Sequence, residues 1–332
     1  MQNARPSSHS SDSQKAMGGA ISRRRLLQGA GVFAAASTLS TIGCTAVQKV
    51  DKNYRASGDN IRQSVVHWCF GTDPNPISEE ELATHAKRLG IPSVEIVAPK
   101  HYKMLQNMGL RCALGVIDMA PDAPFVKGFN NPQYHDRAIK ATKDAIDAAS
   151  AYDCPAVISF SGYSAVNPDD PKSPHLSREE GIQNCIDGYK KIVGHAEKKG
   201  VVISLEVLNT RDDTHPMKGH PGYQANDIEY AVSVIDGVGS DNLKLLFDVY
   251  HVQIMQGDVI RRLRAAKDYI NHYHIAGNPG RAEIDETQEI QYPAVMKAIA
   301  ETGYKGYVAQ EFIPTWDDKV AALAHAVKRC DV

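Results

Sequence analysis

Short apolar runs alternate with longer amphipathic stretches from residue 64 to the end of the chain. Eight runs have the length and apolar character of buried strands: 64–70, 93–97, 110–117, 156–161, 201–208, 243–249, 270–276 and 306–312. The stretches between them show helical patterns, at about 78–89, 99–108, 132–151, 177–199, 226–238, 258–267, 291–302 and 316–330. Strands that alternate with helices in this way indicate βαβ units and a parallel sheet.

The number of these units separates two parallel-sheet folds. Eight units in about 270 residues predict a single (β/α)8 TIM barrel over residues 63–332. Runs such as "VVISL" (201–205) are nearly continuously apolar, as strands covered on both faces are. A doubly wound open sheet would usually carry a Gly-rich phosphate-binding turn after its first strand, and "CFGTDPNP" (69–76) supplies none.

The first 44 residues have a pattern typical of an export signal. A charged "SRRRLL" (22–27) leads into "QGAGVFAAASTLSTIGC" (28–44), an apolar run of small residues. Arg23 and Arg24, followed by two leucines, resemble a twin-arginine (Tat) signal, which implies the Tat export machinery as a partner. The alternative is a basic patch before a buried helix.

The end of this segment, "TIGC", resembles a lipoprotein cleavage box with Cys44 as the lipidated residue. Ordinary cleavage near the same place is the alternative. Residues 45–62 are polar and aperiodic, and they predict a linker between the signal and the barrel. The predicted location is therefore periplasmic, either free or anchored to the membrane as a lipoprotein.

Composition excludes some partner classes. A formal net charge of −2 argues against a protein that grips nucleic acid by its phosphates. The cysteines beyond Cys44 show no CxxC spacing, so they indicate neither a zinc knuckle nor a complete disulfide framework.

Each of the last four predicted strands ends in a residue that can bind a metal ion: Glu206 in "VVISLEVLN", Asp248 in "KLLFDVYH", His274 in "INHYHIAG" and Glu311 in "GYVAQEFIP". In a barrel of this kind, the C-terminal ends of the strands form one functional face. Three carboxylates brought together there would repel each other and lose solvation, and a divalent cation relieves both costs. One such carboxylate alone could be structural, but four residues on consecutive strands predict a metal site.

The predicted donor set is rich in oxygen and contains one imidazole. It favours Mg²⁺ or Mn²⁺, with Co²⁺ or Zn²⁺ as alternatives. A structural zinc site would use thiolates or more imidazoles. Carboxylates on both sides of a metal form an acid–base pair, so these residues indicate metal-assisted proton transfer beside a carbonyl.

Polar residues beside these strand ends are candidates for binding a small-molecule substrate. His251 follows Asp248 by three positions and could contact a substrate oxygen, support a ligand or face solvent at a helix start. Arg281 could hold a substrate carboxylate with two hydrogen bonds, or it could pair with Glu283 or Asp285.

The loop 208–223 is long and polar, as a substrate lid would be, and its candidates are Asn209, Arg211 and His220. His67, near the first strand, could face the pocket or pack in the core.

Four segments, "SLEVLNTR", "KLLFDVYHVQIMQGD", "HYHIAGNPGRAEIDETQEIQYP" and "GYVAQEF", together resemble the hydroxypyruvate isomerase-like proteins of the xylose isomerase-like TIM-barrel superfamily. The resemblance covers roughly residues 62–318. It implies that the four strand-end residues bind a divalent metal and that Glu206 and Glu311 are also the acid–base pair. It further implies that His251 contacts substrate oxygens and that Arg281 binds the substrate.

One position departs from the pattern of that branch. Hydroxypyruvate isomerases carry Gln where this chain has His274, whereas ketose epimerases of the superfamily carry His. The metal site is compatible with either residue, so the departure leaves the substrate open. Members of the superfamily often form dimers or tetramers, and the resemblance therefore implies a homo-oligomer.

These observations predict an isomerase that moves a proton between adjacent carbons of a small hydroxy-carbonyl substrate through an enediolate. Hydroxypyruvate and tartronate semialdehyde are one such pair, and a related sugar isomerase or epimerase reaction is another. A metal-dependent dehydratase of a keto-sugar or dehydroshikimate type and a non-catalytic periplasmic sugar-binding barrel are the alternatives. A nuclease fits less well, because its site would need further His ligands at the second and third strand ends.

Overall fold

Parallel strands alternate with helices in the computed structural model, which describes residues 50–51, 54–214 and 217–332. Seven strands form one parallel sheet in the order β2-β1-β7-β6-β5-β4-β3. They are β1 (Arg62–Val66), β2 (Val94–Glu95), β3 (Ala156–Ser159), β4 (Val202–Glu206), β5 (Leu243–Asp248), β6 (Ile270–Ile275) and β7 (Tyr307–Gln310). The predicted α/β barrel fold is confirmed.

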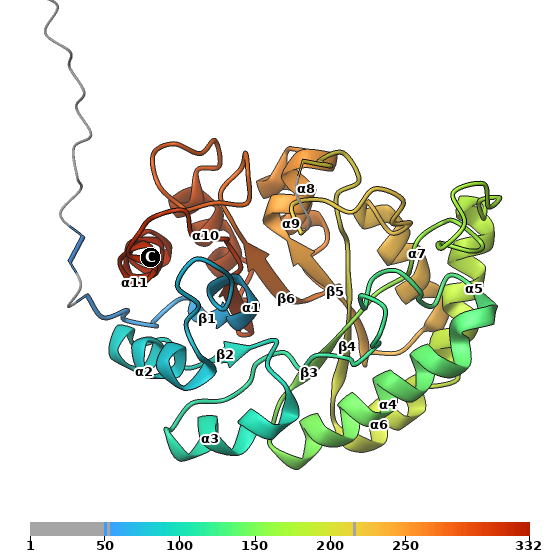
Figure 1. Ribbon diagram of the computed structural model, residues 1–332, viewed down its shortest axis with the longest axis horizontal. Coiled ribbons are helices and arrows are strands. Elements are labelled where there is room, and N and C mark those ends of the chain that lie inside the picture. Colours follow the sequence, from blue (N-terminus) through green and yellow to red (C-terminus); the bar gives the residue numbers. More distant parts are fainter. Residues whose placement is uncertain (1–49, 52–53, 215–216) are drawn as a thin grey trace, which may run out of the picture. The chain divides into compact units, whose positions relative to one another are not determined.

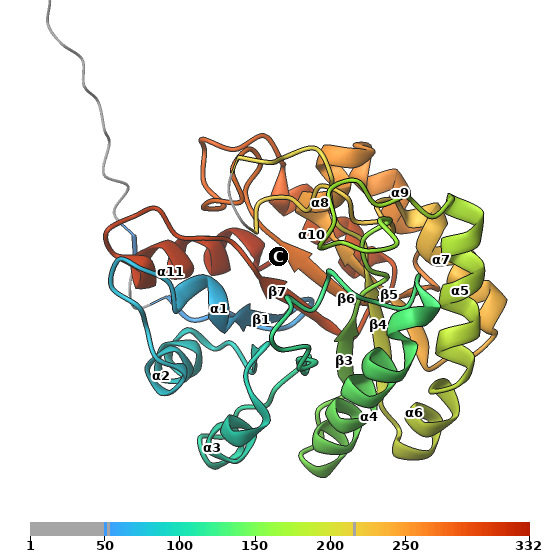
Figure 2. The same cartoon turned by 45° about the vertical axis from the view of Figure 1, so that its right-hand side comes forward.

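Helices surround these strands on the outside (Figures 1 and 2). The α-helices are α1 (His67–Phe70), α2 (Glu79–Leu89), α3 (Tyr102–Asn107), α4 (His135–Ala151), α5 (Arg178–Lys190), α6 (Val193–Lys199), α7 (Ile228–Val238), α8 (Val249–Met255), α9 (Val259–Ala265), α10 (Tyr292–Glu301) and α11 (Lys319–Cys330). Local sequence explains where several begin. Ser177 and Glu180 form a reciprocal capping box at the start of α5, and the Asp227 carboxylate caps α7.

The segment 110–117, predicted as a strand, pairs with its neighbours only at isolated points. Its Arg111 bridges to Ser93, and its Gly115 bridges to Val157 of β3. The segment therefore lies between β2 and β3, the two ends of the seven-stranded sheet. It completes the barrel, although its strand pairing with both neighbours is interrupted.

Gly115, one of the two paired residues, packs closely against its neighbours. A Cβ atom there would lie 2.8 Å from the hydroxyl of Tyr102 and 3.3 Å from a methyl group of Val157. The backbone can approach α3 and β3 this closely only because the position has no side chain.

The first predicted strand ends earlier than its apolar run suggests. The chain leaves β1 at Val66 and forms the short helix α1. The side chains of His67 and Trp68 therefore do not point where they would if the strand continued. His67 interacts with the carbonyl of Ile77 through Nε2 at 3.0 Å, whereas Trp68 lines the pocket described below. The pocket-facing alternative for His67 is therefore wrong.

Residues near the start of the described chain are fixed to its C-terminus. The Tyr54 hydroxyl donates to the Asp331 carboxylate at 2.5 Å, and the Ser57 amide donates to the same carboxylate at 2.8 Å. The predicted Tat signal and Cys44 lie outside the described residues. In the part of the chain that the structure describes, no helix is long and apolar enough to cross a membrane.

Substituting Gly115 tests how the barrel is completed. Gly115→Ala should destabilise the protein by about 1–3 kcal/mol, because the added methyl group overpacks Tyr102 and Val157. Gly194→Ala in α6 is the matched control, since a Cβ there meets nothing within 4 Å. It should be neutral or stabilise by up to about 1 kcal/mol. Urea unfolding measures both, and equal effects would contradict the packing account.

Candidate metal centre

Four side chains from neighbouring strands meet at the C-terminal end of the barrel. Glu206 and Asp248 are the last residues of β4 and β5, His274 lies in β6, and Glu311 directly follows β7. One donor atom from each lies within 4.8 Å of those of the other three, and all four residues are buried. The structure thus brings together the four residues that the sequence predicts as metal ligands.

The imidazole of His274 lies between two of the carboxylates. Its Nδ1 is 2.8 Å from Oε2 of Glu311 and 3.3 Å from Oε1 of Glu206. Parallel pairing brings the third carboxylate beside this imidazole, because Asp248 is the register partner of His274 across β5 and β6. Side chains at paired positions on adjacent strands point to the same side of the sheet.

Asp248 is held by the helix that follows it. Its Oδ1 accepts hydrogen bonds from the backbone amides of Tyr250 at 2.7 Å and His251 at 3.1 Å, which caps α8. Its Oδ2 is 3.5 Å from Nε2 of His251 and 3.7 Å from Nη2 of Arg281. One oxygen therefore anchors the carboxylate while the other faces the centre.

Arg281 supplies the buried positive charge beside the carboxylates. Only 2% of the residue is exposed, and its Nη2 lies 2.5 Å from Oε2 of Glu311. The guanidinium group lies over the rings of Trp68 and Tyr250, at 5.1 and 5.7 Å from their centroids. Its Nε has no hydrogen-bond partner among the described residues.

The alternative pairing of Arg281 with Glu283 or Asp285 is wrong. Glu283 instead accepts hydrogen bonds from the backbone amides of Thr315, at 2.5 Å, and Trp316, at 2.8 Å. The Asp285 carboxylate accepts from Thr287.

The two glutamates experience opposite electrostatic environments. Burial raises the pKa of Glu206, and the nearby Glu311 carboxylate adds to that increase. Burial alone would also raise the pKa of Glu311, but Arg281 and His274 hold that pKa well below its usual range. The pair therefore divides into one carboxyl that retains a proton more readily and one that stays ionised.

His251 is a buried, neutral hydrogen-bond donor beside Asp248. Burial, assisted by the charge of Arg281, lowers its pKa well below the ordinary value. Its Nδ1 accepts from the Asn209 backbone amide at 3.1 Å and faces the Asn209 side-chain amide at 2.7 Å. The proton of the neutral ring therefore resides on Nε2, which is buried without a hydrogen-bond partner in the described chain. The solvent-facing alternative for His251 is wrong.

The loop candidates take three different positions. Asn209 orients His251 rather than lining the pocket, and its Nδ2 also donates to the Lys218 carbonyl at 2.8 Å. His220 lines the pocket, and burial together with Arg281 lowers its pKa to about 3. Arg211 does not reach the centre: it is exposed and donates to the Ile254 carbonyl at 2.9 Å. This hydrogen bond directs its side chain toward α8, and its substrate contact stays a prediction.

A pocket of about 190 Å³ opens above the carboxylates. One side is polar and includes Glu206, Arg281 and Glu311. The remaining wall is mostly apolar and consists of Ile96, Val116, Ala123, Pro124, Phe125, Ile158, Phe160, Leu208 and Met217. The pocket therefore suits a small molecule that is polar at one end.

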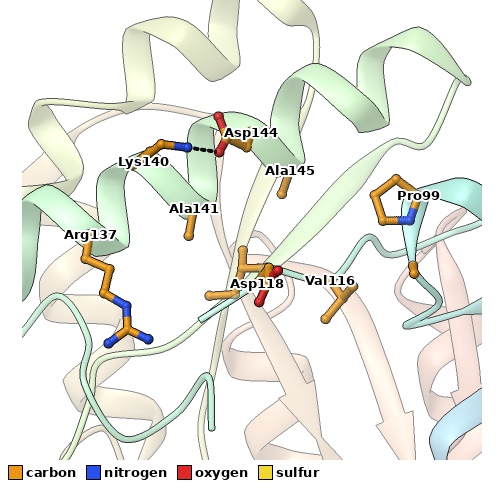
Figure 3. A pocket seen from close by; sticks show the side chains of 10 residues that line it. Pro99, Val116, Asp118, Arg137, Lys140, Ala141, Asp144 and Ala145 are labelled. Atoms are coloured by element: carbon orange, nitrogen blue, oxygen red, sulfur yellow. Dashed lines mark hydrogen bonds and ion pairs between the residues drawn. The ribbon is translucent and has the colours of Figure 1, made fainter. Parts of the chain in front are cut away.

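A larger cleft of about 540 Å³ lies outside the barrel. It lies between α4, the segment that follows β2 and the end of the segment 110–117. Figure 3 shows Lys140 and Asp144 of α4 at its edge, joined by an ion pair of 2.5 Å. Its lining contains none of the four converging residues. The smaller pocket is therefore the candidate site, because Glu206 and Glu311 of the converging group line it.

Comparison with known proteins decides the family. A model of the Xylose isomerase-like TIM barrel family matches residues 39–329. The chain belongs to this family. This agrees with the fold and with the resemblance carried by the last four strand ends.

Curated relatives of this Xylose isomerase-like TIM barrel protein carry isomerase names, which agrees with the predicted enzyme class. The 2-oxo-tetronate isomerase of Cupriavidus necator is 37% identical over 119 residues, which cover 36% of this chain and 43% of the relative. Hydroxypyruvate isomerase of Escherichia coli is 34% identical over 139 residues, covering 42% and 51% respectively. The chain thus spans about half the length of these two relatives. A putative hydroxypyruvate isomerase of Homo sapiens is 26% identical over 79% of this chain and 83% of the relative.

Solved structures share the fold of this family member. An AP endonuclease, family 2, from Brucella melitensis has a TM-score of 0.67 at 22% identity, covering 80% of this chain and 98% of that one. An L-ribulose 3-epimerase has a TM-score of 0.61 at 18% identity, covering 81% and 92%. The IOLI protein, solved with a zinc atom, has a TM-score of 0.58 at 16% identity, covering 81% and 95%.

Sequence reasoning overlooked two kinds of residue near this centre. Trp68 donates through Nε1 to Oε1 of Glu311 at 3.2 Å, and only the early end of β1 brings it there. Glu95 and His272 lie behind His274. The signal that could have indicated them is an acid within the apolar run "VEIV" and two His spaced two apart in "HYH".

The metal-free centre should make stability depend on pH through Asp248. Burial, followed by the Glu311 charge, raises its pKa to about 7, against about 3.9 in an unfolded chain. The folded state therefore keeps a proton that the unfolded state has lost, and stability decreases as pH rises from about 4 through 7. Asp248→Asn removes this cost and can still cap α8, so it should stabilise the metal-free protein at pH 8 by about 1–3 kcal/mol, but not at pH 4.

Urea unfolding of chelator-treated protein across this pH range measures the difference. The exposed Asp241 serves as a control of opposite sign, because Lys244 lowers its pKa. Asp241→Asn should destabilise the protein at pH 8 more than at pH 4. An Asp248→Asn effect that is independent of pH, or that grows at low pH, would contradict the assignment.

Proposed function

We propose that this protein is a metal-dependent isomerase of small hydroxy-keto acids, which interconverts pairs such as hydroxypyruvate and tartronate semialdehyde. The observation that carries the proposal is the convergence of three carboxylates and one imidazole beside a buried arginine in a small pocket. Carboxylates at such a centre supply acid–base chemistry, and the arginine supplies recognition of an acid.

The donor set fits a divalent cation. Four buried donors lie within 4.8 Å of one another, and three of them are carboxylates. Asp248 caps α8 with Oδ1 and turns its other oxygen, Oδ2, toward the group. Mg²⁺ or Mn²⁺ suits this oxygen-rich set best, with Co²⁺ or Zn²⁺ as alternatives. When bound, such an ion would polarise the carbonyl and the adjacent hydroxyl of the substrate.

The two glutamates are suited to move protons between adjacent carbons. In the forward direction, Glu206 removes a proton from the hydroxymethyl carbon, and the electron pair passes into an enediolate. A proton is then delivered to the former carbonyl carbon, and the hydroxyl proton passes from one oxygen to the other, so product and substrate are isomers. Glu206 is the better base candidate, because Glu311 already contacts Trp68, Arg281 and His274.

Two donors are available to hold the substrate. Within the described part of the chain, Nε2–H of His251 and Nε–H of Arg281 have no partner, so the first can donate to a substrate oxygen and the second to a carboxylate. A substrate carboxylate could accept the Nε–H of Arg281, whose Nη2 already pairs with Glu311, and this hydrogen bond favours an acid over a neutral sugar. The relatives named hydroxypyruvate and 2-oxo-tetronate isomerases support the same substrate class.

The barrel is expected to act after export. We propose that the Tat pathway carries it to the periplasm, where the segment ending at Cys44 is removed or becomes a lipid anchor. Support comes from "SRRRLL" and "TIGC" alone.

Deuterium incorporation tests the proposed reaction directly. The Mn²⁺-loaded full chain is incubated with hydroxypyruvate in D2O, and carbon-bound protons are followed by NMR after the metal is removed. Isomerisation with deuterium at carbon is expected. Loss of water would instead indicate a dehydratase, and no reaction with a panel of keto acids and keto-sugars would favour a binding protein.

The same assay examines the base. Glu206→Gln should reduce exchange by at least about 10³-fold, because an amide cannot accept the proton. Glu80→Gln, an exposed position in α2, should retain wild-type exchange. Exchange at the wild-type rate in Glu206→Gln would assign the base elsewhere.

The export proposal predicts a mature N-terminus at or near Cys44. Mass spectrometry of protein isolated from its own host should find a diacylated Cys44 or a free N-terminus close to it. Replacing Arg23 and Arg24 by Lys should leave full-length protein inside the cell. Intact protein beginning at Met1 in the wild-type host would contradict the proposal.

A further inference from the structure

A second group of buried polar side chains lies directly against His274, inside the barrel. Oε1 of Glu95 is 2.8 Å from Nε2 of His272 and 3.1 Å from Nε2 of His274. The three residues are between 0% and 2% exposed. The function proposed above uses neither Glu95 nor His272.

The strands explain how these groups meet. His272 and His274 are two positions apart in β6, so both side chains point to the same side of the strand. Glu95 ends β2, which is separated from β6 by β1 and β7 in the sheet. Its side chain therefore reaches across the barrel interior to contact them.

The hydrogen-bond pattern fixes where the imidazole protons are. An ionised carboxylate only accepts, so each Nε2 that contacts Glu95 must donate. Nδ1 of His274 faces Glu206 and Glu311 and, by the same rule, donates to the ionised Glu311 carboxylate. A metal ion would replace that Nδ1 proton, and the proton on Nε2 would stay with Glu95.

We propose that Glu95 is a positioning residue that holds His274 as the Nε2–H tautomer, with Nδ1 directed at the metal, and that His272 holds Glu95 in turn. The inference rests on the metal-binding part of the proposed function. Carboxylates commonly orient a metal-binding imidazole in this way, and their loss weakens metal binding about 10–100-fold. The conformation of β2 thereby contributes to a centre whose ligands all come from β4 to β7.

A second metal ion at Glu95, His272 and His274 is the competing interpretation, because their donor atoms also lie within 4.8 Å of one another. Oε2 of Glu95 has no hydrogen-bond partner among the residues described. The positioning role is favoured because such an ion would have three protein donors and would require His274 to bind two ions through its two nitrogens. The stoichiometry of binding distinguishes the two interpretations.

Metal titration of the full chain tests the proposal. Chelator-treated protein is titrated with Co²⁺, and the affinity, stoichiometry and visible absorption bands are recorded. Wild type should bind one equivalent, Glu95→Ala should bind at least about 10-fold more weakly with altered bands, and Glu95→Gln should recover part of the affinity through its retained acceptor oxygen. Ser159→Ala, which removes a buried hydrogen bond of 2.9 Å to Tyr189, controls for general destabilisation and should bind as wild type does.

The outcomes separate the two proposals. Wild type that binds no Co²⁺ would overturn the proposed function along with the inference. If wild type binds Co²⁺ and the Co²⁺ affinity of Glu95→Ala equals that of wild type or of Ser159→Ala, the positioning role alone would be overturned. Two equivalents in wild type and one in His272→Gln would replace it by a second metal site.

A measurement on the wild type keeps the test independent of whether the variants fold. In Zn²⁺-loaded, ¹⁵N-labelled protein, NMR should find the His274 proton on Nε2 and the metal on Nδ1. A proton on Nδ1 and metal on Nε2 would overturn the proposal.

Discussion

The mutual repulsion of three carboxylates in a buried space is the constraint on which the rest of the centre depends. Two unit charges about 4 Å apart repel by roughly 4 kcal/mol at the effective dielectric constant of a protein surface, more than a helix cap contributes. Among the described residues, the buried cationic groups that offset this repulsion are Arg281 and, when protonated, His274. Each has its own support: the rings of Trp68 and Tyr250 pack against Arg281, and Glu95 contacts His274.

Asp248 shows how one residue can satisfy local structure and chemistry together. Its backbone ends a strand, one oxygen begins the next helix, and the other oxygen faces the centre. A polar residue at the end of the apolar run 243–247 is therefore needed twice. Removing the carboxylate affects both roles, whereas an amide preserves the cap and removes only the charge.

Much of the fold and the centre could be predicted from sequence, because both follow short-range rules. Alternating apolar runs and amphipathic stretches indicated the barrel, and polar residues at consecutive strand ends indicated Glu206, Asp248, His274 and Glu311. The rest depends on packing that no local pattern encodes. The segment 110–117 is apolar enough for a strand, but it pairs with its neighbours only at Arg111 and Gly115. Trp68 and Glu95 reach the centre only because the chain turns early after β1 and because β2 faces β6 across the interior.

Electrostatic asymmetry links this geometry to a reaction that moves one proton at a time. If the two carboxyls had the same pKa, neither would be better suited than the other to donate or to accept a proton. Arg281, Trp68 and His274 gather around Glu311, and Glu206 contacts only His274 among these three. The pKa values of the two carboxyls are therefore displaced in opposite directions, and acid–base pairs in active sites commonly use such a separation. The neutral imidazoles of His251 and His220 complete the arrangement, because they can donate or pack beside the substrate without adding charge.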